Sequence, residues 1–147
     1  MKTPSMIAVT LLLCAHLARA EEPKALQLGP DDIKFVDAPP ALPAGTRSAL
    51  LEGDPKGAGI VTMRFLIPKG ARVAVHTHPT DERVTVLKGV VHVSFGDEKS
   101  ARAFPAGSYY VNPKGVQHSV WVDEETLIQI TVQGPWGINF VTAPAPR

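Results

Sequence analysis

The chain has a single cysteine in 147 residues, and that residue, Cys14, lies within an apolar run near the N-terminus. If the run is removed on export, the mature chain holds no thiol. Disulfide bonds, thiolate metal sites and cysteine nucleophiles are then excluded. The stability of the mature protein must therefore come from a packed core and from any metal ion that it binds.

Neither sign of charge dominates. Removing Lys2 and Arg19 from the 15 basic residues leaves 13, against 14 acidic residues, and neither kind is clustered. This balance gives no support for binding to nucleic acid or to an anionic membrane surface. The sequence also lacks a P-loop, a dinucleotide-binding glycine fingerprint and a Ser-His-Asp arrangement, so nucleotide binding and serine hydrolysis have no support.

The first 20 residues have the pattern of a secretory signal peptide. Lys2 supplies a short positive region, residues 7–17 form a largely apolar run, and residues 18–20 read Ala-Arg-Ala, an A-x-A cleavage site. The run is too short for a stable transmembrane helix. We predict cleavage after Ala20, export to the periplasm or the medium, and no stable membrane insertion; the alternative is a buried N-terminal helix.

The remaining chain is long enough for one well-buried domain. Residues 21–48 are rich in Pro and Asp, and their prolines fix extended backbone. We expect an irregular or edge-strand arm there, packed on the domain or on a second subunit, with a leader without fixed structure as the alternative. The domain is predicted at 49–141, and 142–147 form a short Pro-rich tail.

From residue 60 onward, short β runs follow one another at intervals of about 8–12 residues, each stopped by a Gly or Pro turn signal. No segment has a convincing 3.6-residue period. This pattern is typical of an all-β sandwich or barrel. The predicted strands are 60–67, 72–78, 83–87, 90–95, 101–104, 109–111, 118–122, 126–132 and 138–141.

Four side chains indicate a metal site. His76 and His78 are two residues apart, so in an extended strand their imidazoles point to the same face. Glu82 follows a turn-forming step at 79–81 that allows its carboxylate to fold back towards them. A fourth ligand must come from a neighbouring strand, and His118 is the obvious candidate.

The parity of residues on the strand that carries His76 and His78 indicates a cavity around this site. Arg72 and Ala74 share the parity of the two strand histidines, whereas Val73 and Val75 have the opposite parity. Small or polar residues on the ligand face suggest a cavity there rather than dense packing. His92 has no spaced partner, so we interpret it as a residue behind the ligands or on the surface. Other polar candidates, each with an ordinary core or surface interpretation, are Arg64, Tyr109, Gln117, Trp121 and Gln129.

The segments that carry the four residues resemble the two signature motifs of the cupin superfamily. Gly70 to Gly89 reads G-x5-H-x-H-x3-E-x6-G, and Gly107 to His118 reads G-x5-P-x-G-x2-H, with 17 residues between them. The resemblance covers every metal-ligand position of the family pattern and spans residues 49–141. It implies a single-domain jelly-roll barrel (a double-stranded β-helix).

Imidazole and carboxylate ligands suit one divalent transition-metal ion, namely Fe, Mn, Ni, Cu or Zn. Three His and one Glu leave coordination positions of an octahedral ion open, so the leading hypothesis is an enzyme of dioxygenase or lyase type acting on a small oxygen-bearing molecule. The alternative is a non-catalytic, metal-dependent module that binds or senses a small ligand. A third possibility is a closed structural Zn²⁺ site. By analogy with other cupins, we expect a homodimer.

Overall fold

The structure, a computed structural model, describes residues 25–141. The predicted signal peptide at 1–20 and the predicted tail at 142–147 lie outside the described residues. Within 25–141, no helix has the length and apolar character needed to span a membrane. In chain order the elements are η1 (Pro30–Asp32), β1 (Val36–Asp37), β2 (Arg47–Glu52), β3 (Ile60–Ile67), β4 (Arg72–Thr77), β5 (Glu82–Lys88), β6 (Val90–Ser94), η2 (Glu98–Ser100), β7 (Arg102–Pro105), β8 (Tyr109–Asn112), β9 (His118–Trp121), β10 (Thr126–Gln133) and β11 (Asn139–Phe140).

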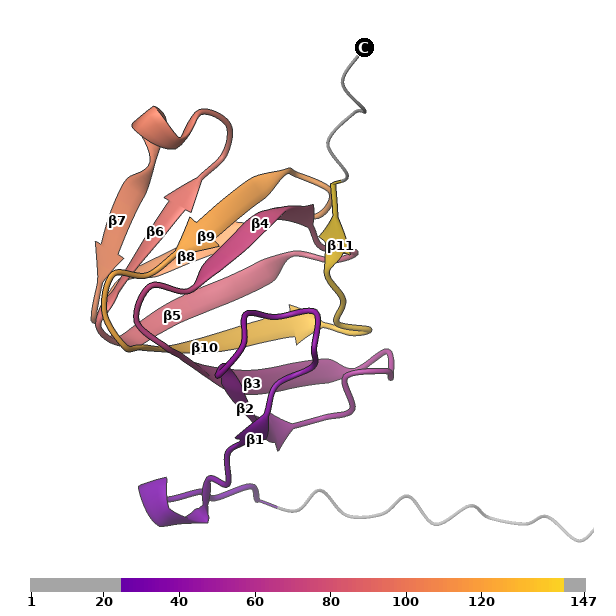
Figure 1. Ribbon diagram of the computed structural model, residues 1–147. Helices are drawn as coiled ribbons and strands as arrows, with labels where there is room; N and C mark the ends of the chain where they lie inside the picture. Colours follow the sequence, from indigo (N-terminus) through magenta and orange to yellow (C-terminus); the bar gives the residue numbers. More distant parts are fainter. Residues whose placement is uncertain (1–24, 142–147) are drawn as a thin grey trace, which may run out of the picture.

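The strands form two antiparallel sheets that lie one over the other (Figure 1). The six-stranded sheet has the order β1-β2-β3-β10-β5-β8, and the five-stranded sheet has the order β11-β4-β9-β6-β7. From β3 onward the chain passes repeatedly between the two sheets, so strands distant in sequence become neighbours. This topology confirms the predicted all-β, single-domain jelly roll.

The core lies between the sheets and follows from the two-residue period of the strands. Along β3 and β10 buried and partly exposed residues alternate, and the buried ones pair across the ladder, for example Met63 with Ile130. The outward positions carry polar side chains, such as Arg64, whose Nε donates to Gln129 Oε1 at 3.0 Å. Each strand therefore contributes one apolar face to the interior.

The segment predicted as an arm joins the six-stranded sheet. β1 pairs with the start of β2, at Val36 with Ser48, and β2 itself crosses the domain boundary predicted at residue 49. The preceding residues, including η1, extend away from the two sheets (Figure 1). The chain between β1 and β2 lies against the interior, because Leu42 packs on the core cluster.

Gly89 is expected to be the least replaceable of the motif glycines. It has φ +76°, and a Cβ built there would lie 2.5 Å from Thr126 Oγ1 and 2.9 Å from Glu125 O. Thr126 is fully buried and cannot move aside. Gly89→Ala should therefore lower the free energy of unfolding by more than the roughly 1–2 kcal/mol that a left-handed backbone costs an L-residue.

Gly70→Ala is the matched control, measured with Gly89→Ala by urea denaturation. Gly70 has φ +78°, but a Cβ there would meet nothing within 4 Å. It carries the backbone strain without the clash, so its loss of stability should be smaller. Equal losses in the two variants would contradict the clash at Gly89.

Candidate metal centre

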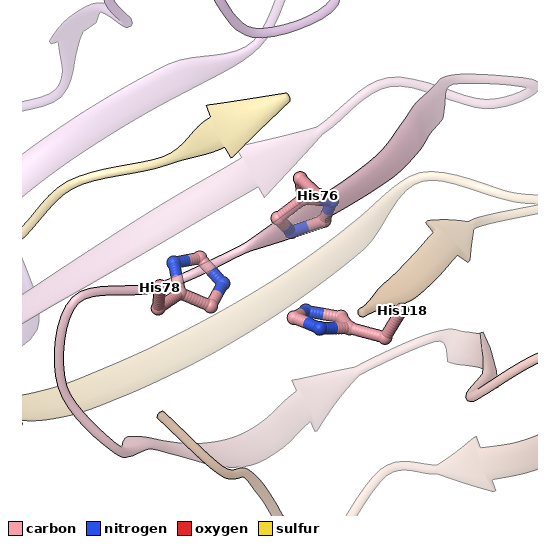
Figure 2. Close-up of side chains that lie close together, drawn as sticks. All are labelled: His76, His78 and His118. Atoms are coloured by element: carbon pink, nitrogen blue, oxygen red, sulfur yellow. The ribbon is translucent and has the colours of Figure 1, made fainter. Parts of the chain in front are cut away.

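Three histidines converge in the interior. His76 near the end of β4 is directly opposite His118 at the start of β9, and His78 follows β4. Figure 2 shows the three imidazoles turned towards one another. Their ring centroids are 4.2–5.1 Å apart, and one nitrogen from each ring lies within 4.8 Å of the others. All three side chains are buried.

A β-bulge sets the direction of His76. Val73 pairs with Val120 and His76 with His118, so two residues on β4 oppose one on β9 between these pairs. Both Val73 and His76 consequently face the interior. The prediction that Arg72 and Ala74 share the face of His76 is therefore wrong, since both are exposed and strict alternation does not hold across the extra residue.

The backbone fixes which nitrogen of each ring is free. The Nδ1 atoms of His76, His78 and His118 lie 2.7, 2.7 and 3.1 Å from the carbonyl oxygens of Ala74, Gly137 and Val116, respectively. A carbonyl only accepts, so each Nδ1 carries the hydrogen and each neutral ring has its lone pair on Nε2. Among the described residues, the buried Nε2 atom of His118 has no hydrogen-bond partner. This is the tautomer that metal-binding histidines adopt.

Glu82 lies beside His78. At the start of β5, its carboxylate is buried, and Oε2 is 3.1 Å from His78 Nε2. Asn112 Nδ2 donates to Oε2 at 3.0 Å, and Trp136 Nε1 donates to Oε1 at 3.2 Å. The structure thus brings the three imidazoles together with Glu82 against one of them, and the four-ligand set stays a prediction.

Burial and the carboxylate act in opposite directions on the histidines. Burial lowers the pKa of His76 to about 4 and also lowers the pKa of His118. Burial has the same effect on His78, but the adjacent Glu82 outweighs it and the pKa of His78 is raised. Burial alone would raise the pKa of Glu82, yet His78 and the two side-chain donors lower it. Glu82 and His78 thus favour each other's charged forms, whereas burial favours the neutral forms of His76 and His118.

A cavity of about 60 Å³ opens next to these groups. His76, His78 and Glu82 line it on one side, and most of the remaining wall is apolar. Part of the wall comes from the segment that precedes β2, including Leu42 and Thr46. The other lining residues are Pro43, Phe65, Ile67, Val73, Tyr110, Asn112, Val120, Ile128, Ile130, Trp136 and Ile138.

None of the five other polar candidates lines this cavity. Arg64 and Gln129 bond to each other on the outer face, Tyr109 is 59% exposed, and Gln117 is exposed. Trp121 stacks on His92 with the ring planes 6° apart, and His92 Nε2 is 3.0 Å from Asp123 Oδ2. His92 is thus outside the histidine cluster, as interpreted from the sequence.

The sequence reasoning missed Tyr110, Asn112 and Trp136. Tyr110 and Asn112 are the inward residues of β8, one position out of step with the Tyr109 proposed from sequence. Burial and Glu82 raise the pKa of Tyr110, so its hydroxyl keeps the proton. Trp136 lies in a Gly- and Pro-rich loop without periodicity. The same loop supplies the Gly137 carbonyl that orients His78, so one connection positions two site residues.

Comparison with known structures supports the fold. An acetylacetone dioxygenase from Acinetobacter johnsonii is 22% identical, with a TM-score of 0.66, covering 84% of this chain and 81% of that one. The polyketide cyclase RemF from Streptomyces resistomycificus is 17% identical, with a TM-score of 0.67 and coverages of 83% and 89%. A chain of the complex of SigE with the anti-sigma ChrR from Rhodobacter sphaeroides is 20% identical, with a TM-score of 0.55 and coverages of 71% and 51%.

No match was found among curated protein sequences. The family model described as the ChrR Cupin-like domain matches residues 24–137, which include both motifs up to His118 and the loop that holds Trp136. The match extends over most of the chain, and the jelly roll and the three-histidine cluster agree with it. The protein therefore belongs to the ChrR cupin-like domain family of the cupin superfamily.

Proposed function

We propose that this protein is a metal-dependent enzyme, of dioxygenase or lyase type, that acts on a small oxygen-bearing molecule. The observation that carries the proposal is the convergence of three imidazoles whose Nδ1 atoms are committed to backbone carbonyls. One nitrogen of each ring lies within 4.8 Å of the others, and His76, His78 and the Glu82 carboxylate line a largely apolar cavity. Such a site suits an ion with open coordination positions.

The donor set fits a divalent transition-metal ion held by His76, His78, His118 and Glu82. Two ligands bound cis to an octahedral ion at about 2.1 Å lie about 3 Å apart, close to the 3.1 Å between His78 Nε2 and Glu82 Oε2. Imidazole and carboxylate admit Fe, Mn, Ni, Cu or Zn. When bound, the ion would act as a Lewis acid towards an oxygen of the substrate.

Residues of the chain would orient the Glu82 carboxylate and shield the substrate from water. Asn112 and Trp136 each donate to one oxygen of Glu82, so the carboxylate has a fixed orientation before any ion arrives. The apolar wall keeps water from most of the substrate and strengthens the electrostatic interactions within the site. The cavity volume of about 60 Å³ favours a substrate of few atoms.

Metal binding is expected to weaken as the pH falls, because every ligand imidazole must be deprotonated. His78, with a pKa raised above 6.5, takes up a proton first. As the pH falls through this raised pKa, the affinity should begin to decrease, by up to about tenfold per pH unit. It should fall more steeply near pH 4, where His76 is also protonated. Competition titration with a chelator measures the profile, and an affinity unchanged down to about pH 4 would contradict histidine ligation.

A second function is favoured by the family itself. The matching family model takes its name from ChrR, and one structural neighbour is a chain of a complex between ChrR and a sigma factor. A non-catalytic cupin that binds metal and senses a small ligand would use the same histidines and the same cavity. It would differ from an enzyme in releasing its ligand unchanged.

Elemental analysis of the protein purified from its native compartment, which we propose is the periplasm or the medium, tests the proposal. A redox-active ion with exchangeable water, and O2 uptake with acetylacetone as the first probe, supports the enzyme. Tight binding of a small ligand without turnover supports the sensor. A closed, four-ligand Zn²⁺ without exchangeable water would contradict both and leave a structural site.

A further inference from the structure

Asn112 presents a buried hydrogen-bond acceptor beside the candidate metal centre. The residue is 1% exposed and lines the cavity, and its Nδ2 donates to Glu82 Oε2 at 3.0 Å. A carboxylate only accepts, so the amide nitrogen must face Glu82, and this fixes Oδ1 as the remaining atom of the amide. Oδ1 has no hydrogen-bond partner within the part of the chain that the structure describes.

An unpaired carbonyl in such a place points to a ligand. Burying an acceptor without a partner costs free energy, and native proteins leave few such groups unless they serve a function. A ligand that donates a hydrogen bond to Oδ1 recovers this cost, whereas a ligand that carries only acceptors does not. Oδ1 therefore favours ligands that carry a hydrogen-bond donor, a requirement that the metal-binding residues do not impose.

The other residues of the cavity wall restrict the class of ligand further. The hydroxyls of Thr46 and Tyr110 can donate or accept, so they tolerate either kind of group, while Oδ1 only accepts. No Lys or Arg is among the described lining residues, which favours a neutral ligand. The volume of about 60 Å³ corresponds to roughly four to six water-sized groups.

We propose that Asn112 is a specificity-determining residue that selects small, neutral molecules carrying an O–H or N–H group next to a metal-binding oxygen. This inference rests on the proposed metal-dependent function, because Asn112 bonds to the candidate metal ligand Glu82, which in turn lies beside His78. A hydroxyl near a bound cation is more acidic than a free one and is therefore a stronger donor to Oδ1. The simplest members of this class are α-hydroxy ketones.

The test compares two probes on the full chain loaded with Zn²⁺, which is redox-inactive and so prevents oxidative turnover. 3-Hydroxybutan-2-one and butane-2,3-dione have the same non-hydrogen skeleton, but the first has a hydroxyl where the second has a carbonyl. Isothermal titration calorimetry should show the hydroxy ketone binding about tenfold or more tightly, because only it pairs with Oδ1.

Two variants separate the role of Oδ1 from support of Glu82. Asn112→Leu and Trp136→Phe each remove one hydrogen bond to that carboxylate, and each should lower the affinity for Zn²⁺ by about 10–100-fold. Only Asn112→Leu removes Oδ1. The preference for the hydroxy ketone should therefore disappear in Asn112→Leu and persist in Trp136→Phe, with both measured at saturating Zn²⁺.

The outcomes distinguish this inference from the function on which it rests. Equal affinity of the wild-type chain for the two probes, or a preference that persists in Asn112→Leu, overturns the role of Asn112 and leaves the metal site intact. Failure of Zn²⁺ to bind, or failure of both probes to bind the loaded chain, overturns both. If Asn112→Leu does not fold, as judged by circular dichroism, Asn112→Ala, which also removes Oδ1, replaces it in the same comparison.

Discussion

Metal content should fall to background when His118 is replaced by alanine. The side chain is 1% exposed, and its Nε2 has no hydrogen-bond partner among the described residues. The ladder between β4 and β9 places it opposite His76. Loss of a ligand should cost more than the roughly 10–100-fold in affinity that follows loss of an outer hydrogen bond. Elemental analysis after dialysis, together with chelator competition, measures the effect.

His92→Ala is the matched control for this prediction. His92 lies outside the cluster, stacked on Trp121 with the ring centroids 5.3 Å apart, and should retain the full metal content. Circular dichroism of both variants shows whether the fold survives. A folded His118→Ala variant that binds metal as tightly as the wild-type chain would remove His118 from the ligand set.

Ile130→Ala is expected to have the largest effect on stability. Ile130 is 1% exposed on β10, between Met63 on β3 and Val84 on β5. Truncation there removes buried apolar atoms and leaves a cavity that the flanking strands cannot fill. The free energy of unfolding should fall by about 2–5 kcal/mol. Urea denaturation monitored by circular dichroism measures the loss.

Leu50→Ala is the comparison for Ile130→Ala. It deletes a similar apolar side chain from β2, where Leu50 is 52% exposed, so its effect should lie within about 0.5 kcal/mol. The slope of free energy against urea should be unchanged in both variants. Similar losses in the two variants would show that the core does not lie between the two sheets as described.

Much of the fold could be predicted because turn residues and alternation are local signals. The predicted strand 60–67 coincides with β3, and the predicted strand 126–132 ends one residue short of β10. The proximity of His76 and His78 was predicted from their two-residue spacing, although β4 ends at Thr77 and His78 lies just beyond it. The approach of His118 depends on a long-range ladder; His118 was the obvious candidate for a ligand from a neighbouring strand, and the motif resemblance indicated the same residue.

The parts that could not be predicted depend on departures from regular geometry. The bulge near Ala74 shifts the parity of β4, and nothing in the local sequence announces an extra residue in one strand of a pair. On β8 the choice between Tyr109 and Tyr110 depends on pairing with β5, which sequence does not reveal. The place of Trp136 in the cavity wall results from tertiary packing against Phe65, with the ring centroids 5.7 Å apart.

The candidate ligands come from both layers of the barrel. Glu82 begins a strand of the six-stranded sheet, while His76 and His118 belong to the five-stranded sheet. A bound cation would cross-link the two layers, and because the unfolded chain lacks this arrangement, its binding energy would add to folding energy. The melting temperature would then rise with the supply of metal. The resistance of the folded chain to proteolysis would in turn depend on the supply of metal.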